Sequence, residues 1–193
     1  MHKKTMLPVL SIVLLCASQM AQSSNTADPT VSCRNLLSAP APDTEIASAT
    51  LLSEHNGLAP FCQIEGQIAQ KLGFVMRLPA DHWNGKFVVT GCGGFCGSLQ
   101  PDKPGYSNSM NESLKLGYAV IHSWDTYWPI ADPQALQLYA GAWMPLAVAS
   151  GKAFVKQYYQ TAPDRTYFSG CSNGGRLGMV AAQRYPRLFD GIA

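Results

Sequence analysis

Two stretches in the first half of the chain alternate between apolar and other positions. The alternating residues are Ile64, Gly66 and Ile68, followed by Phe74, Met76 and Leu78. A period of two places every second side chain on the same face of a β-strand. We therefore expect two strands here, antiparallel to each other, each with one buried face.

The second half of the chain alternates short apolar runs with segments of helical spacing. Strands are predicted at residues 86–90, 118–123, 166–168 and 189–193, and helices at residues 110–116, 138–159 and 175–185. Strands that alternate with helices are typical of a parallel sheet covered by helices. The predicted fold class is α/β.

The N-terminus has the pattern of an export signal. Lys3 and Lys4 precede an apolar run over residues 6–16, and small residues follow at Ala17, Ser18 and Ala21. The apolar run is short for a membrane span. We predict a signal peptide over residues 1–21, no stable membrane span after its removal, and a secreted or periplasmic protein; a membrane anchor or a buried helix is the alternative.

Residues 22–60 are rich in Ser, Ala, Pro and Thr, a composition typical of loops. We predict an extended lead-in anchored by Cys33, with one short helix near residues 46–52. Residues 61–193 are predicted to form the main domain.

Composition narrows the class of protein. Charged residues make up 13% of the 193, apolar residues 47%, and the net charge is +2. Such a composition is typical of a folded, enzyme-like domain, and it argues against a nucleic-acid-binding protein because no basic cluster occurs beyond the N-terminus.

The cysteines indicate disulfides. Six are present, and removal of a signal peptide containing Cys16 leaves five: Cys33, Cys62, Cys92, Cys96 and Cys171. An exported protein meets oxidising conditions, so bridges are expected. Because five is odd, one thiol is free or has its partner outside these residues. Zinc at the closely spaced Cys92 and Cys96 is the rival interpretation, but no second close pair accompanies them.

The most specific motif is the hexapeptide over residues 170–175, Gly-Cys-Ser-Asn-Gly-Gly, directly after the strand predicted at residues 166–168. It fits the G-x-S-x-G nucleophile elbow, a strained turn between a strand and a helix. Ser172 is therefore the candidate nucleophile, and the backbone amide of Asn173 is a candidate oxyanion donor. The alternative is a glycine-flanked turn that happens to contain serine.

A second glycine-rich segment follows the strand at residues 86–90. Glycines let a backbone approach a ligand closely, and this fold class takes its second oxyanion donor from such a loop. Gly93 and Gly94 are the candidates. A bridge between Cys92 and Cys96 would stiffen the loop if the two Cα atoms lie within about 7 Å.

A base for Ser172 is harder to find. No histidine follows it, and Asp190 is the only carboxylate that does. Since catalytic triads occur in several chain orders, His122 with Asp125 is an alternative. Their separation of three positions suits a local contact better.

Together these motifs resemble the tannase and feruloyl esterase family, which includes the mono(hydroxyethyl) terephthalate hydrolases. The resemblance covers residues 61–193 and rests on residues 170–176, 182–186 and 189–192 around the elbow, and on residues 83–87, 93–95 and 117–120 before it. Asn173 stands where the family more usually has threonine, and residues 124–128 replace a more usual Asp-Thr-Gly-His.

The resemblance implies an α/β-hydrolase core, of which these residues would be the N-terminal part, with the lid and the C-terminal part of the core missing. It implies a serine esterase acting on small aromatic esters of feruloyl or galloyl type. Its Asp and His would lie downstream, as would the disulfide partner of Cys171. No cofactor is expected in these residues, although the family's lid carries a calcium site. A catalytically inactive truncated product, or a non-catalytic binding domain, is the second hypothesis.

Overall fold

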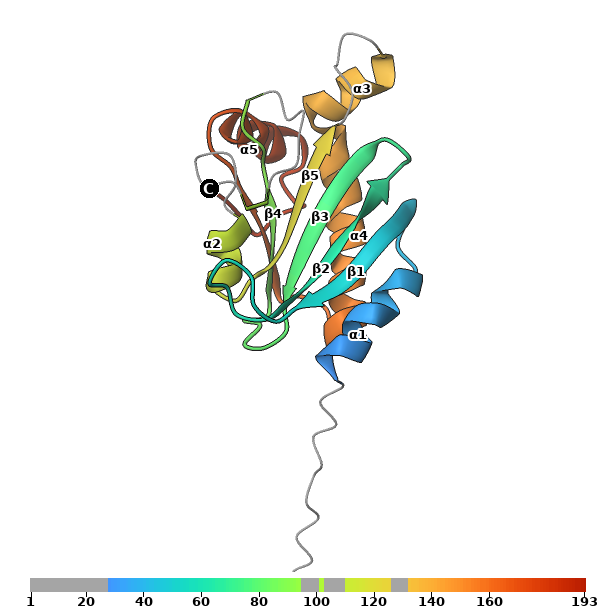
Figure 1. Ribbon diagram of the computed structural model, residues 1–193. Helices are drawn as coiled ribbons and strands as arrows, with labels where there is room; N and C mark the ends of the chain where they lie inside the picture. The colour runs from blue at the N-terminus through green and yellow to red at the C-terminus, as the bar shows by residue number, and fades with distance from the viewer. Residues whose placement is uncertain (1–27, 95–100, 103–109, 126–131) are drawn as a thin grey trace, which may run out of the picture.

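The computed structural model describes residues 28–94, 101–102, 110–125 and 132–193, with the backbone alone for residues 124 and 125 (Figure 1). Its strands are β1 (Thr44–Leu52), β2 (Phe61–Ile68), β3 (Leu72–Pro79), β4 (Lys86–Thr90), β5 (Ala119–Asp125), β6 (Arg165–Ser169) and β7 (Gly191–Ile192). Within these ranges the seven strands form one sheet in the order β1-β2-β3-β5-β4-β6-β7. The predicted α/β class is confirmed.

The first three strands form an antiparallel meander. Phe61 pairs with Pro79 and Ile68 with Leu72, so β2 and β3 form the hairpin that the alternation predicts. All eight residues of β3 are buried, because β3 lies between β2 and β5 and is covered on both faces. It therefore forms the centre of the antiparallel half.

The other half of the sheet consists of parallel strands. The direction in which the chain adds strands to the sheet reverses at β4. The chain passes from β4 to β5 on one side and then crosses back to β6 on the other side of β4. Ligands of open α/β sheets bind beyond the carboxyl ends of the strands at such a reversal. The carboxyl ends of β4 and β6 are therefore where a functional site is expected.

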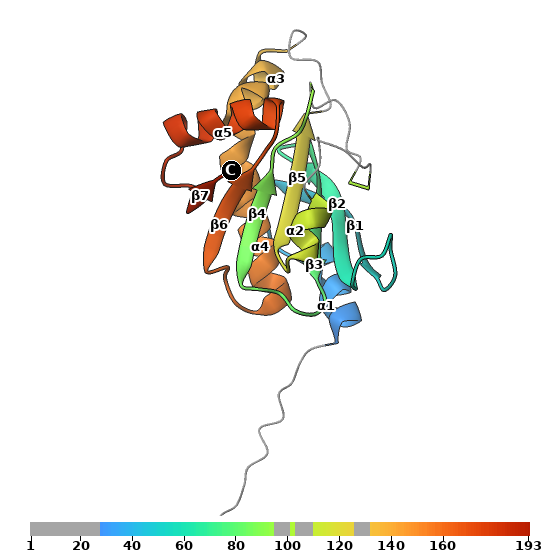
Figure 2. The same cartoon turned by 90° about the vertical axis from the view of Figure 1, so that its left-hand side faces the viewer.

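Helices cover both faces of the sheet. They are α1 (Pro29–Asn35), η1 (Leu36–Ser38), α2 (Met110–Lys115), α3 (Pro133–Gln137), the π-helical turn η3 (Leu138–Ala142), α4 (Trp143–Tyr159) and α5 (Asn173–Arg184). Side chains of α1, α4 and α5 share one hydrophobic core, whereas those of α2 belong to a second core on the opposite face (Figure 2). Among the described residues, no helix is long and apolar enough to cross a membrane.

A prediction for the N-terminal part was wrong: residues 46–52 belong to strand β1, not to a helix. The register of its pairing with β2 shifts at a β-bulge between Ile46 and Ser48. This bulge interrupts the alternation of buried and exposed positions that would have indicated a strand. Pairing of eight of its nine residues with β2 outweighs the local preference.

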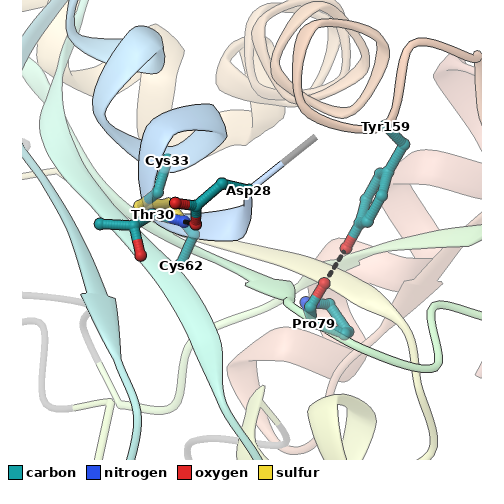
Figure 3. Close-up of a disulfide and its surroundings, with 6 residues drawn as sticks. All are labelled: Asp28, Thr30, Cys33, Cys62, Pro79 and Tyr159. Atoms are coloured by element: carbon teal, nitrogen blue, oxygen red, sulfur yellow. Dashed lines mark hydrogen bonds between the residues drawn. A yellow bond between two sulfur atoms is a disulfide. The ribbon is translucent and has the colours of Figure 1, made fainter. Parts of the chain in front are cut away.

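A disulfide attaches α1 to the sheet. Cys33 of α1 and Cys62 of β2 are bonded, with their Cα atoms 5.6 Å apart, and both are buried (Figure 3). Asp28 caps α1 by accepting a hydrogen bond from the Thr30 amide. The described part of the predicted lead-in is therefore packed against the sheet.

The helix predicted at residues 138–159 is regular only in α4. In a continuous helix Pro145 could not donate a backbone hydrogen bond to Gly141, and its ring would crowd the carbonyl of that residue. The chain responds with the π-helical turn η3, in which Gly141 has a φ of 109°. At the other end of α4, the Tyr159 hydroxyl donates a 2.8 Å hydrogen bond to the carbonyl of Pro79 (Figure 3).

Candidate active site

Ser172 occupies a strained turn between β6 and α5. Its φ is 57° and its ψ −118°, a conformation that residues with a Cβ rarely adopt, and its side chain is exposed. Backbone strain of this kind is concentrated at functional sites. The sharp turn and exposed serine are the features that the motif predicts.

The Ser172 hydroxyl is not used to cap α5. A serine preceding a helix usually accepts a hydrogen bond from an amide of the first turn. Here the side chain makes no capping bond, while the Ser172 carbonyl accepts the Arg176 amide at 3.1 Å. The backbone thus starts the helix, and the hydroxyl remains available for chemistry.

Glycines allow the turn to be this tight. A Cβ on Gly170 would lie 2.6 Å from the backbone of Gly174, and a Cβ on Gly174 would lie 3.1 Å from the backbone of Gly91. The first contact explains why small residues stand on both sides of the serine. The second shows that the end of β4 lies directly against the start of α5.

This contact determines where the glycine-rich loop begins. The Gly91 amide donates to the Ser169 carbonyl at 2.8 Å, so the loop leaves β4 beside the last residue of β6. Gly93 and Gly94 follow at once, and Gly94 has a φ of 56°, which favours glycine. The roles of their amides remain predictions.

The start of α5 is electropositive. Asn173 is its first residue, and the leading amides of a helix have no intrahelical partner and carry partial positive charge. No acidic residue lies in the first turn. A negative charge developing beside Ser172 would be stabilised there.

His122 is engaged away from Ser172. Its Nδ1 lies 2.8 Å from the Thr90 hydroxyl, and burial lowers the pKa of the imidazole to about 4, despite a hydrogen bond to Thr90 that acts in the opposite direction. Both residues lie in described parts of the chain, and no hydrogen bond joins His122 to Ser172. The side chain of Asp125 lies outside the description, so the alternative pairing with it is untested.

Cys92 and Cys171 differ in whether they form a disulfide. Cys92 is disulfide-bonded to a partner outside the described residues, where Cys96 also lies, and Cys171 is free and exposed. A disulfide at Cys92 contradicts the rival zinc interpretation, since zinc requires a thiolate. In the described ranges there is no group of three or more His, Cys, Asp or Glu side chains that could hold a metal ion.

The sequence reasoning missed a charged cluster that joins β3 to the segment between β4 and α2. Arg77 of β3 has no exposed side-chain surface, and it contacts both carboxylate oxygens of Asp102, at 2.9 and 3.1 Å. Asp102 also pairs with His55 at 2.9 Å. An arginine within an otherwise apolar strand was the available signal, because a buried charge requires a partner.

Burial of Asp102 opposes its ionisation, but other interactions outweigh this effect. Hydrogen bonds from Arg77, His55 and Asn111, together with the charge of Arg77, hold the pKa of Asp102 well below its ordinary value. The carboxylate therefore remains charged and attaches this part of the chain between β4 and α2 to the sheet.

Comparison with known proteins identifies the family. The family model described as tannase and feruloyl esterase matches residues 56–193. The chain belongs to this family. The resemblance inferred from the motifs is thereby confirmed.

Relatives within the tannase and feruloyl esterase family are considerably longer than this chain. An uncharacterized esterase of Xanthomonas campestris pv. campestris is 29% identical over 95% of the chain and 34% of its own length. Mono(2-hydroxyethyl) terephthalate hydrolase of Piscinibacter sakaiensis is 35% identical over 76% of the chain and 27% of its own length. The chain thus spans between about a quarter and a third of the length of these curated relatives.

Structural comparison agrees on the fold. Feruloyl esterase B from Aspergillus oryzae superposes with a TM-score of 0.71 at 21% identity, over 86% of this chain and 36% of that one. The expected α/β-hydrolase fold is thereby confirmed for this member of the tannase and feruloyl esterase family.

Proposed function

We propose that this chain carries the nucleophile and the oxyanion donors of a serine carboxylic-ester hydrolase. The observation that supports this most strongly is the conformation of Ser172, an exposed non-glycine residue with a φ of 57° whose hydroxyl does not cap the following helix. Such strain at a residue whose side chain makes no capping hydrogen bond is consistent with catalysis.

In the proposed reaction, the Ser172 Oγ attacks the ester carbonyl carbon while a base accepts its proton. The carbonyl oxygen becomes an oxyanion and accepts hydrogen bonds from the amide of Asn173 and that of Gly93 or Gly94. The tetrahedral intermediate expels the alcohol, which takes up the proton from the base. The base then takes a proton from water, whose oxygen attacks the acyl carbon. The bond between that carbon and Oγ breaks, Ser172 recovers its proton from the base, and the acid is released.

The base is proposed to come from sequence beyond these 193 residues. All four histidines, namely His2, His55, His82 and His122, precede Ser172. His122 is buried and bonded to Thr90, and His55 is paired with Asp102. The greater length of the relatives supports a base and an acid from an additional segment.

The substrates are proposed to be esters of small aromatic acids. Relatives are named feruloyl esterase and mono(2-hydroxyethyl) terephthalate hydrolase, and the acids in both names contain a single aromatic ring. Export to an oxidising compartment is proposed as well, which suits the disulfide between Cys33 and Cys62.

Covalent trapping tests the proposal on the chain as it is. The protein is incubated with an activated aromatic ester, such as the 4-nitrophenyl ester of ferulic acid, with imidazole added as a diffusible base. We expect one acyl group on the peptide that contains Ser172, detected by mass spectrometry, and none on the Ser172→Ala variant.

The neighbouring thiol requires a control. Cys171 is exposed and lies on the same peptide, so it could be acylated instead. Neutral hydroxylamine cleaves thioesters faster than oxygen esters, and a serine adduct should survive it. If wild-type protein and the Ser172→Ala variant are acylated equally, or neither is acylated, the serine mechanism is excluded and a non-catalytic domain is supported.

A further inference from the structure

We propose that Arg176 is a positioning residue for the oxyanion donor: it holds Asn173, and with it the first amide of α5, against the fixed turn η3. This inference rests on the proposed function, because it assigns a role in stabilising the oxyanion formed at Ser172. Arg176 itself is not assigned a contact with the substrate.

Arg176 lies at a helix position where a positive charge is unfavourable. It lies in the first turn of α5, where the helix dipole disfavours positive charge and favours Asp or Glu, and no acidic residue is present there. Among the described residues, no ion pair compensates its charge. A residue whose charge opposes the helix dipole is a candidate for function when its contacts lead to a proposed site.

The first contact of Arg176 controls the side chain of Asn173. Its Nε donates a 2.6 Å hydrogen bond to the Asn173 Oδ1. An asparagine at the start of a helix readily bonds to nearby backbone groups and so competes with the helical conformation. Because Oδ1 accepts this bond from Arg176, the side chain of Asn173 attaches its own backbone, and with it the first amide of α5, to the guanidinium.

The second set of contacts connects Arg176 to η3. Its Nη2 donates to the Tyr139 carbonyl at 3.0 Å, and the guanidinium lies 4.5 Å from the centroid of the Tyr139 ring. The turn itself packs tightly on α5, because a Cβ on Gly141 would lie 2.8 Å from the Val180 side chain. The guanidinium therefore joins Asn173 to a turn that also packs against the middle of α5 through contacts other than those of Arg176.

Only a guanidinium makes both contacts at once. Arg presents several donors in a rigid plane that can also stack on an aromatic ring, whereas Lys has a single ammonium group. This geometry predicts that Arg176→Lys will not restore the function of Arg176, even though it keeps the charge.

The chain provides a matched control on the same helix. Arg184 lies in the last turn of α5 and also reaches η3, with its Nη1 3.5 Å from the Ala140 carbonyl. It does not contact Asn173 in the described structure. Arg184→Gln therefore removes a bond between α5 and η3 without disturbing the proposed positioning of Asn173.

The experiment measures the rate at which Ser172 is acylated by the 4-nitrophenyl ester over a range of ester concentrations. In Arg176→Gln we expect the saturating rate to fall by about tenfold or more, since loss of one oxyanion donor costs a factor of roughly 100 to 1,000. The half-saturating concentration should stay within about twofold, because the bound ester has lost only an interaction made in the transition state. Arg184→Gln should keep the wild-type rate.

A double-mutant cycle tests the route through Asn173. Asn173→Ala should lower the saturating rate about as much as Arg176→Gln, and the double variant should show no further loss. Additive losses, a saturating rate in Arg176→Gln within about threefold of wild type, or a full rate in Arg176→Lys would each overturn the proposal. Circular dichroism establishes that each variant is folded before its rate is compared.

The two proposals fail in different ways. If wild-type protein is not acylated on Ser172, the proposed serine mechanism is wrong. If wild-type protein is acylated and Arg176→Gln reacts at the same rate, the mechanism stands and the role given to Arg176 is wrong.

Discussion

Gly91 and Gly174 are in direct backbone contact, such that a Cβ added to Gly91 would lie 2.8 Å from the Gly174 Cα. The same Cβ would lie 2.9 Å from the buried ring of Phe168. The end of β4 and the start of α5 thus share a space that accommodates no side chain, and the position of the serine turn depends on it.

Gly91→Ala should therefore disturb both stability and chemistry. We expect the free energy of unfolding to fall by about 1–3 kcal/mol, the usual cost of overpacking, and the acylation of Ser172 to slow. Urea denaturation measures the first effect. Gly175→Ala is the control: its Cβ would meet only the Gly170 carbonyl, at 3.6 Å, so it should fold at least as well as wild type. If the Gly91→Ala variant were as stable as wild type, the end of β4 and the start of α5 would be able to move apart without cost.

Asp102→Asn should destabilise the protein at neutral pH. Arg77 would lose its charged partner but keep a hydrogen bond to Gln63, and Asp102 is about one-third exposed, so we expect a loss of roughly 1–3 kcal/mol rather than that of a fully buried pair. The pKa of Asp102 is lowered by folding, so its contribution is complete above the unfolded pKa of about 4 and declines as the pH falls below it.

Urea denaturation at several pH values measures this difference between wild type and Asp102→Asn. Glu112→Gln serves as the control, because the ion pair between Glu112 and Lys115 is exposed and should contribute less than about 0.5 kcal/mol. A stability difference that does not change between pH 7 and pH 3 would contradict the assignment.

His122 should remain neutral throughout the physiological range. Burial lowers its pKa from 6.5 to about 4, so the unfolded chain binds a proton more readily than the folded one between these values. Stability should fall as the pH drops from 6.5 towards 4, and this part of the pH dependence should be absent in His122→Gln. Titration of the imidazole by NMR gives the pKa directly, and a midpoint near 6.5 would refute the prediction.

Removal of the disulfide in the Cys33→Ala/Cys62→Ala variant should release α1 from β2. The two cysteines are 29 residues apart in sequence, and closing a loop of this size contributes roughly 3.5 kcal/mol in the chain-entropy model. A reducing agent should lower the denaturation midpoint of wild type more than that of the double variant, which retains only the bridge at Cys92. Equal shifts would show that the bridge between Cys33 and Cys62 contributes little.

The elements that the sequence predicted well are those whose pattern is uninterrupted. β2 and β3 alternate without a break, and β4, β5 and β6 are short apolar runs between clear turns. β1 was missed because a bulge between Ile46 and Ser48 shifts its register, which is decided by pairing with β2 and not by local preference. The break at Gly141 depends on Pro145, whose effect on helix geometry outweighs the helical spacing around it.

The candidate site likewise combines features that the sequence predicted with features that it could not predict. The strained serine could be predicted because the glycines around it belong to one local motif. The contact of Gly91 with Gly174, and the attachment of Asp102 to Arg77, join residues far apart in sequence, so no local pattern could reveal them. Arg176 did leave a local signal, a positive charge in the first turn of a helix, whose meaning emerged only with its contacts to Asn173 and Tyr139.

The strand order has a consequence for biosynthesis. Both ladders of β4 are completed by strands made after it: Val88 pairs with Val120 on one side and with Tyr167 on the other. While the chain folds, β4 keeps open hydrogen-bonding groups on one edge until β6 has docked, and such edges invite association with other unfolded chains. We infer that the interval before β6 docks is when this protein most needs a chaperone.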